Sequence, residues 1–425
     1  MLTLLLSLPA RALTLDQAWA AATDHDLQLA LARERSIQAD TMRGKAWSAL
    51  QPRLDVGAQY VINNTEIALD FSSMIPEEFA AIVYPDGPPP PTIVQEKAFW
   101  QGDVTLSQRL VSGPAIPLLR AAYGFSAAGR DDLRAAEVES KTRVAAAFYG
   151  QLTAERAMAV AEQGVALAQS QLALAQRQSE AGLIDERAMV QARLGLSRAE
   201  RDLRTAQEGV TSARTGFELA AGIPGTDLEL PEPMAVPTGL DAALIQARER
   251  RPDLQAAARR AEAMHHQRLA QDLRWLPAID GVATYSYTQN PGFNDQNWNW
   301  RIVLAASWNL WDGGLRFAES RETASQVRAA EFGRELLEDS IVREITVAFE
   351  SYARAQSGLV SVENERALAA QSLELAETSY AAGGASFLEV EQARLMVQAT
   401  ELSALRERMA RDLAAIELLA RTGSL

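Results

Sequence analysis

Few residues in this sequence could take part in acid–base or metal chemistry. The chain has three histidines, His25, His265 and His266, and no cysteine. The adjacent pair lies in a segment with helical periodicity, where neighbouring side chains point about 100° apart and do not face one metal ion together. Without cysteine there is no disulfide, no thiol nucleophile and no cysteine-rich metal site. We therefore expect surface histidines, no metal and no cofactor.

The sequence also lacks the motifs of the common enzyme classes. It contains no glycine-rich phosphate loop and no arrangement of a nucleophile with histidine. The net charge is −14, whereas a surface that binds nucleic acid usually carries a basic patch. We predict that the protein is not an enzyme and that it does not bind nucleic acid.

The composition is typical of long helices packed on one another. Hydrophobic residues make up 48% of the 425 residues but aromatic residues only 6%, and alanine and leucine are frequent. The segments 117–181 and 315–382 read as continuous helices, which would each span roughly 100 Å. Shorter helical stretches cover about 14–50 and 240–275. Asp26 predicts a break near the start of the first stretch, and the Arg-Pro-Asp sequence at 251–253 predicts one near the start of the second.

The first twelve residues, MLTLLLSLPARA, resemble a secretory signal. An apolar run is followed by a small-x-small cleavage pattern, and we predict a signal peptide remnant at 1–12. The basic region that normally opens such a signal is missing, so we expect the true start to lie upstream. The alternative is the short apolar N-terminus of a cytoplasmic helix. No stretch reaches the roughly 18 apolar residues of a membrane-spanning helix.

The chain aligns with itself. LQPRLDVGAQY at 50–60 resembles WLPAIDGVATY at 275–285 with an offset of 225, whereas the turn and QARL sequence at 181–194 resembles 382–395 with an offset of 201. The change of offset indicates an insertion in the first copy between 61 and 98, where YPDGPPPPT predicts a proline-rich loop. We predict two tandem repeats, at 13–225 and 226–425.

Each repeat contains two segments in which apolar and polar residues alternate with a period of two. We predict strands at about 53–63 and 99–111 in the first repeat, and at 278–288 and 298–311 in the second. Aromatic residues of these strands are expected to face lipid or the membrane interface; they are Tyr60, Trp100, Tyr285, Trp298, Trp300 and Trp308.

A strand of about ten residues with this pattern has the length of a barrel strand that crosses a bilayer. An open four-stranded sheet cannot stand in hydrocarbon, because its edge N–H and C=O groups would have no partner. Closure takes about eight strands or more, so two or three chains must share one barrel. The alternative is a soluble helical-hairpin scaffold whose small sheet caps the helices and whose long coiled coils bind partners.

The ordered set of features resembles the TolC-like outer-membrane efflux protein family, also called outer membrane factors. The resemblance is carried by LTLDQAW at 13–19, by proline-led strands at Pro52 and Pro277, by LWDGG at 310–314 and by the turn followed by QAR in each repeat. It implies a homotrimer with a membrane α+β fold. Three chains form one twelve-stranded β-barrel, with four strands per chain, continuous with a long periplasmic α-helical barrel.

The resemblance also implies a function and a place in the cell. Members of this family are passive exit ducts in the outer membrane of Gram-negative bacteria, with an extension into the periplasm. They conduct substrates for a tripartite efflux or type I secretion system. Their partners are a periplasmic adaptor, or membrane fusion protein, and an inner-membrane pump of the proton-driven or ABC type, besides outer-membrane lipid.

In the family, the turns between the long helices are periplasmic tips that dock the adaptor. Here the tips would be at 181–185 and 382–386. Glycine permits a positive φ where a helix ends, and aspartate or serine can cap the next helix. The predicted docking residues are Gly182, Leu183, Ile184, Asp185, Gly383, Gly384, Ala385 and Ser386.

The family also implies a gate near the second tip, built from a tyrosine, an arginine and two acids. The tyrosine corresponds to Tyr380 and the first acid to Glu389, but Ala385 and Gln392 stand at the other two positions. Three copies of Glu389 around a narrow axis would form an acidic ring that favours cations. The alternative for Glu389 is an ordinary solvated position on a helix.

Overall fold

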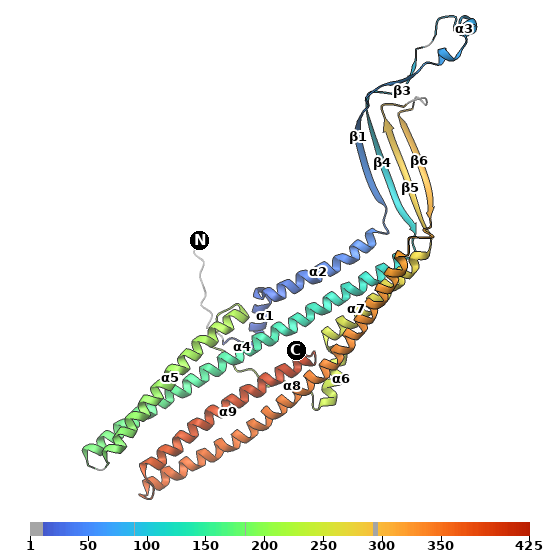
Figure 1. Ribbon diagram of the computed structural model, residues 1–425. Coiled ribbons are helices and arrows are strands. Elements are labelled where there is room, and N and C mark those ends of the chain that lie inside the picture. Colours follow the sequence, from blue (N-terminus) through green and yellow to red (C-terminus); the bar gives the residue numbers. More distant parts are fainter. Residues whose placement is uncertain (1–11, 89, 183, 292–295) are drawn as a thin grey trace, which may run out of the picture. The chain divides into compact units, whose positions relative to one another are not determined.

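The computed structural model describes residues 12–88, 90–182, 184–291 and 296–425 (Figure 1). Residues 1–11 of the predicted signal lie outside this part of the chain. The chain divides into two compact units. One unit comprises Met1–Gln38, Ala127–Ala258 and Glu331–Leu425, and the other comprises Ala39–Ser126 and Arg259–Ala330. Each unit contains parts of both predicted repeats.

Long helices dominate the chain. Two of them, α4 and α8, run without a break for 66 and 67 residues. Both lack an internal proline beyond the first turn, where Pro117 of α4 is tolerated because its missing N–H has no partner there anyway. The helices are α1 (Leu15–His25), α2 (Leu27–Ser48), α4 (Ala115–Glu180), α5 (Glu186–Ala221), α6 (Leu240–Arg250), α7 (Pro252–Asp272), α8 (Leu315–Ala381) and α9 (Phe387–Arg421).

The first of the two units, which we call the helical unit, is stabilised by two apolar clusters. In the first, Phe148 of α4 lies edge-on to Phe217 of α5, with ring centroids 6.0 Å apart, and both rings are fully buried. In the second, Ile345 of α8 and Leu418 of α9 are fully buried against α6. The first cluster joins α1, α4 and α5 with Met409 and Ile416 of α9, and the second joins α6, α8 and α9 with Leu254 of α7. Burial of these side chains is the main stabilising term.

The other unit contains a four-stranded antiparallel sheet, as expected. Its strands are β1 (Arg53–Ile62), β4 (Ala98–Val111), β5 (Ala278–Thr288) and β6 (Trp298–Ser307), in the spatial order β1-β4-β5-β6. The last strand ends at Ser307 and not at 311. Ala278, the first residue of β5, pairs with Ser307, and the preceding Pro277 has no N–H to continue the ladder.

In the segment between β1 and β4, the described residues of the proline-rich stretch, 84–88 and 90–91, form a loop as predicted, and regular elements flank this loop. The segment contains β2 (Ile67–Leu69), a 3-10 turn η1 (Phe71–Met74), α3 (Glu77–Val83) and β3 (Thr92–Gln95), with β2 and β3 paired. The backbone N–H of Asn63 donates to the carbonyl of Lys97 at the base of this segment. The strands β2 and β3 are three and four residues long. An alternating pattern cannot be recognised over so few residues. Across the described ranges, no helix combines the length and the apolar composition needed to cross a membrane.

Candidate functional site

The sheet has one apolar and one polar face, because residues paired across neighbouring strands point to the same side. Val56 pairs with Val104, Val104 with Tyr285 and Tyr285 with Trp300, so a single apolar row crosses all four strands. The row beside it runs Asp55, Thr105, Thr284 and Arg301. Most side chains of the apolar face are exposed in the chain taken alone. Because a large apolar face is rarely left exposed to water, we expect another apolar layer to cover it.

The aromatic residues of the strands gather on the apolar face near one end of the sheet. Tyr60 and Trp100 are paired across β1 and β4, with ring centroids 5.1 Å apart. Trp298 stacks against Tyr285 at 5.3 Å and also contacts Tyr287 at 4.5 Å. Trp300 pairs with Tyr285 and is 70% exposed. All the predicted strand aromatics except Trp308 therefore belong to one band.

Trp308 lies toward the opposite end of the sheet. Its indole N–H donates to the carbonyl of Trp275 at 3.0 Å, and its side chain is 62% exposed. Eight residues of extended chain separate it from Trp300, which corresponds to about 26 Å at the usual rise of a strand. Because barrel strands tilt by about 35–45°, this length corresponds to a height of roughly 18–21 Å, which is comparable to the apolar band of about 25 Å in a membrane barrel.

One residue of the aromatic band was missing from the predicted site. Tyr287 contacts Trp298 in a tilted arrangement on the same face, two positions after Tyr285. Residues two positions apart on a strand lie on the same face, so the alternating pattern of β5 could have placed Tyr287 beside Tyr285.

The polar face carries ion pairs that leave it nearly neutral. Arg53 contacts Asp55 at 2.9 Å within β1, and Arg109 contacts Asp280 at 3.0 Å across β4 and β5. All four side chains are substantially exposed to solvent, so each pair contributes little to stability. Such a face suits contact with water.

Among the described residues, each of the two outer strands of the sheet has one neighbouring strand. β1 pairs with β4 alone and β6 with β5 alone. Each therefore presents an unpaired row of backbone N–H and C=O groups. Because the number of strands is even and all neighbours are antiparallel, β6 of one copy would run antiparallel to β1 of the next.

At the first predicted tip, α4 ends at Glu180 and α5 begins at Glu186. Gly182 has a φ of +71°, the left-handed conformation that glycine adopts at little cost. The carboxylate of Asp185 accepts a hydrogen bond from the N–H of Ala188 at 2.9 Å and so caps α5. Ile184 is half-buried, and Leu183 lies outside the described residues.

At the second tip, Gly383 has a φ of +79°. The N–H of Gly384 donates to the carbonyl of Ser379 at 2.8 Å, and Ala385 is half-buried. Ser386 caps α9 through a reciprocal pair of hydrogen bonds: its hydroxyl accepts from the N–H of Glu389, and the Glu389 carboxylate accepts from the N–H of Ser386.

The predicted gate residues lie on either side of this second turn. Tyr380 is in the last turn of α8 and is 40% exposed. Glu389 is in the first turn of α9, where its carboxylate completes the capping pair. The spacing Ser-x-x-Glu is a known capping signal, so this local role could have been read from the sequence. The role of both residues in a gate stays a prediction.

A second acid near this tip is buried. Glu391 is 7% exposed and neither of its carboxylate oxygens accepts a hydrogen bond within the described chain. Burial raises the pKa of Glu391, and the nearby charge of Arg394, 3.6 Å away, opposes that rise. Arg394 also contacts Glu377 of α8 at 2.7 Å, so it bridges the two helices just behind the turn.

Comparison with known sequences identifies one family. Residues 243–424 match the family model of the outer membrane efflux protein. This match confirms the resemblance over most of the second predicted repeat. A search of the curated proteins finds no match.

The fold matches solved structures over nearly the whole chain. CusC aligns with a TM-score of 0.76 at 18% identity, covering 97% of this chain and 92% of that one. VceC of Vibrio cholerae, an outer membrane protein, aligns at 0.74 and 18%, with 96% of both chains covered. The outer membrane channel MtrE of Neisseria gonorrhoeae, in its open state, aligns at 0.74 and 16%, covering 96% and 88%. The chain shares their fold.

Proposed function

We propose that this chain, whose residues 243–424 belong to the outer membrane efflux protein family, is the exit duct of a tripartite efflux or type I secretion system. It resides in the outer membrane of a Gram-negative bacterium and extends into the periplasm. It conducts substrates passively, and the energy comes from an inner-membrane pump.

The sheet is the observation that carries the proposal. Its exposed apolar face, bounded by aromatic residues about 26 Å apart at the usual rise of a strand, suits lipid, whereas its polar face suits a water-filled lumen. The two open edges cannot remain unpaired in hydrocarbon. Three copies joined through β1 and β6 form a twelve-stranded barrel with no free edge. The resemblance to the outer membrane factor family implies three copies and not two.

The helix tips are the proposed contact with a periplasmic adaptor. Gly182 and Gly383 reverse the chain within a few residues, and the caps Asp185 and Ser386 fix the start of each returning helix. The exposed turns therefore have a defined shape that a partner could recognise. Glu389 follows the second turn directly, and in a trimer its three copies would place negative charge around the axis.

Cell fractionation followed by electrophoresis tests this function. The protein should be found in the outer membrane, should require detergent for extraction and should migrate as a trimer that heating converts to monomer. The competing scaffold hypothesis expects release without detergent. A monomer purified from the soluble fraction would contradict the exit-duct proposal.

A further inference from the structure

The helical unit contains two matching breaks between short helices. The first elbow, residues 25–27, separates α1 from α2, and the second elbow, residues 250–252, separates α6 from α7. Each packs on a glycine with positive φ that follows a returning helix. His25 covers Gly222 at the end of α5, and Arg250 covers Gly423 after α9; a Cβ on either glycine would lie within 3 Å of the elbow.

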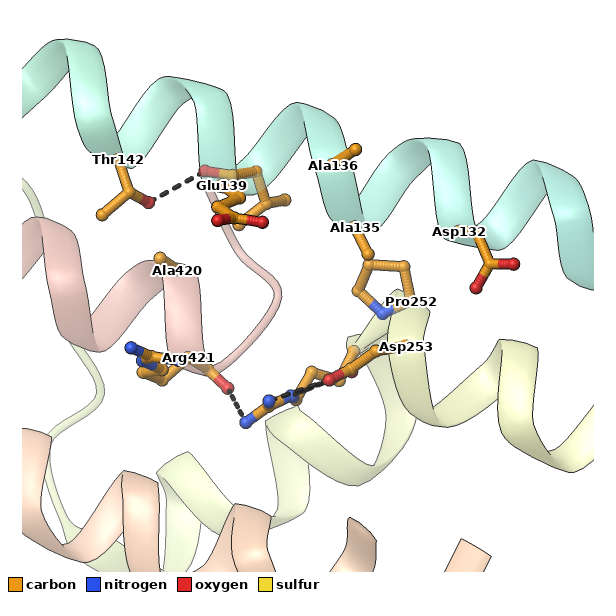
Figure 2. A pocket seen from close by; sticks show the side chains of 11 residues that line it. Asp132, Ala135, Ala136, Glu139, Thr142, Pro252, Asp253, Ala420 and Arg421 are labelled. Atoms are coloured by element: carbon orange, nitrogen blue, oxygen red, sulfur yellow. Dashed lines mark hydrogen bonds and ion pairs between the residues drawn. The ribbon is translucent and has the colours of Figure 1, made fainter. Parts of the chain in front are cut away.

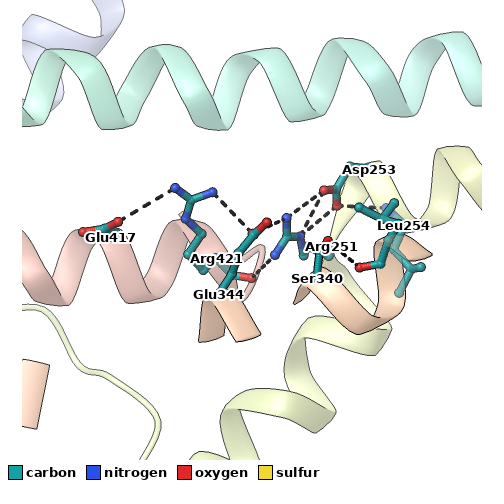
Figure 3. Close-up of polar contacts among 8 residues, drawn as sticks. Arg251, Asp253, Leu254, Ser340, Glu344, Glu417 and Arg421 are labelled. Atoms are coloured by element: carbon teal, nitrogen blue, oxygen red, sulfur yellow. Dashed lines mark hydrogen bonds and ion pairs between the residues drawn. The ribbon is translucent and has the colours of Figure 1, made fainter. Parts of the chain in front are cut away.

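Each elbow also forms an ion pair with a long helix. Asp26 of the first elbow accepts hydrogen bonds from Arg143 and Ser140 of α4, both at 2.6 Å. Arg251 of the second elbow contacts Glu344 of α8 at 2.9 Å (Figure 3). Asp26 and Arg251 are mostly buried, with side chains 11% and 9% exposed. Their partners on the long helices, Arg143 and Glu344, are 38% and 35% exposed, so each pair is partly buried.

The two pairs occupy corresponding positions and have opposite polarity. Asp26 and Arg251 are 225 positions apart, and Arg143 and Glu344 are 201 apart. These are the offsets that align the two repeats before and after the insertion. The first repeat thus has a negative elbow and a positive long helix, and the second repeat has the reverse.

The local sequence accounts for both polarities. Asp26 also caps α2, since its carboxylate accepts from the N–H of Gln28 at 2.8 Å. At the second elbow Pro252 opens α7 instead, and Asp253 both accepts from the N–H of Leu254 and holds Arg251 at 2.8 Å. The way in which the following helix begins therefore determines the charge of each elbow. The long helix carries the opposite charge.

The second elbow lies close to both long helices. A cavity of about 410 Å³ is lined on one side by Arg251, Pro252 and Asp253 and on the other by α4 residues that end at Thr142 (Figure 2). Arg143 is the next residue of α4, and it contacts Asp26 and Glu139. Arg251 instead contacts α8, and through Glu344 it is linked to Arg421 (Figure 3).

We propose that the reversed ion pairs select which long helix each elbow joins during folding and assembly. A wrong pairing, in one chain or between two copies, would place Asp26 against Glu344 and Arg251 against Arg143. Like charges brought together in a partly buried contact disfavour the wrong partner. This role requires only the fold of the helical unit, so it stands apart from the exit-duct function.

Cysteine reporters can read the pairing, because the native chain contains no cysteine. Thr23 and Lys141 line one cavity next to the first elbow, so Thr23→Cys with Lys141→Cys reports the native pairing through a short bis-maleimide cross-linker. Val342 stands 201 positions after Lys141 on α8. Thr23→Cys with Val342→Cys therefore reports the wrong pairing, within or between chains.

The test variant is Asp26→Arg with Arg143→Glu, which keeps an ion pair but gives both repeats the same polarity. The matched control is Asp26→Gln with Arg143→Gln, which removes the charges and, like the test variant, leaves a poor capping residue at the start of α2. After refolding of the full chain, the wrong-pairing cross-link should be several-fold higher in the test variant than in the control. Adding Arg251→Glu and Glu344→Arg restores opposite polarity and should lower it again.

A purely structural role for these pairs expects a different result. The test variant would then refold with the native cross-link alone, since its ion pair is intact, and the neutral control would be the poorer of the two. An equal or lower wrong-pairing signal in the test variant than in the neutral control overturns the proposal. That comparison decides the question even if the fourfold variant does not fold.

Discussion

The two halves of this chain build similar local structures from different residues. Each half has an elbow, a tip and a two-stranded hairpin. The first elbow is capped by Asp26 and the second opens with Pro252; the first tip is capped by Asp185 and the second by Ser386 with Glu389. The hairpins differ most, since β1 and β4 are joined through β2, η1, α3 and β3. Backbone geometry is shared, whereas charge and loop length differ.

A function that belongs to one half alone is expected at the positions where the two halves differ. Features needed for the fold, such as a positive φ at the tips or an alternating strand, recur in both halves. The two candidate gate positions differ between the halves, because the first half has Ser179 and Ala188 where the second half has Tyr380 and Glu389. A gate is therefore expected at the second tip alone.

The largest predicted effect concerns the apolar face, which both hairpins share. Leu304→Arg on β6 and Val104→Arg on β4 should each destabilise the membrane-inserted state by about 2–4 kcal/mol, because a charge would face the hydrocarbon. The same substitution at the neighbouring polar-face positions Val303 and Thr105 should cost far less. Folding into lipid vesicles under a urea gradient measures the difference. Equal losses on the two faces would show that neither face contacts lipid.

The elbows provide the next largest effect. Burial would raise the pKa of Asp26, but hydrogen bonds from Ser140, the backbone and Arg143 outweigh it and lower that pKa. Stability from this group is therefore full above the unfolded-state pKa of about 3.9 and is lost as the pH falls through the folded-state pKa. Asp26→Asn keeps the cap and should cost about 1–3 kcal/mol at neutral pH.

The pH dependence separates this effect from a simple packing loss. The free-energy gap between wild type and Asp26→Asn should close as the pH falls below the folded-state pKa. Asp24→Asn, at an exposed position of α1, serves as the control and should follow the wild-type curve. If the gap stayed constant down to acidic pH, the ion pair of Asp26 would not be the source of the stability difference.

The tips should respond alike if their turns are equivalent. Gly182→Ala and Gly383→Ala should each cost about 1–2 kcal/mol, since a Cβ strains the left-handed conformation although there is open space around it. Gly333→Ala, within α8, should instead stabilise by about 0.5–1 kcal/mol. Amide hydrogen exchange at the starts of α5 and α9 locates the change. A loss at one tip only would show that the two turns are not equivalent.

The smallest effect on stability, and the sharpest distinction between the halves, is expected at Glu389. Glu389→Gln keeps an acceptor for the Ser386 N–H and so preserves the capping pair while it removes the charge. Stability should change little, but single channels in planar bilayers should lose cation preference. Ala188→Glu at the corresponding position of the first tip is the comparison. Unchanged selectivity in Glu389→Gln would place this residue outside the pore.

Sequence patterns were sufficient for the parts of the fold with strong periodicity. The strands, the long helices and the breaks at Asp26 and Arg251 follow from alternation, helical periodicity and proline placement. The short pair β2 and β3 could not be read, because three or four residues give no period. The reversed ion pairs also escaped, because each joins residues more than 90 positions apart that only the packed helices bring together.

The central claim, a barrel closed by three copies through their open strands, is tested most directly by cross-linking the edges. Gln59→Cys on β1 and Asn299→Cys on β6 place one thiol on each outer strand of a chain without other cysteines. In native membranes, a flexible bis-maleimide should yield covalent dimers and trimers and nothing larger. Products confined to the monomer, or a ladder extending beyond three copies, would contradict the account.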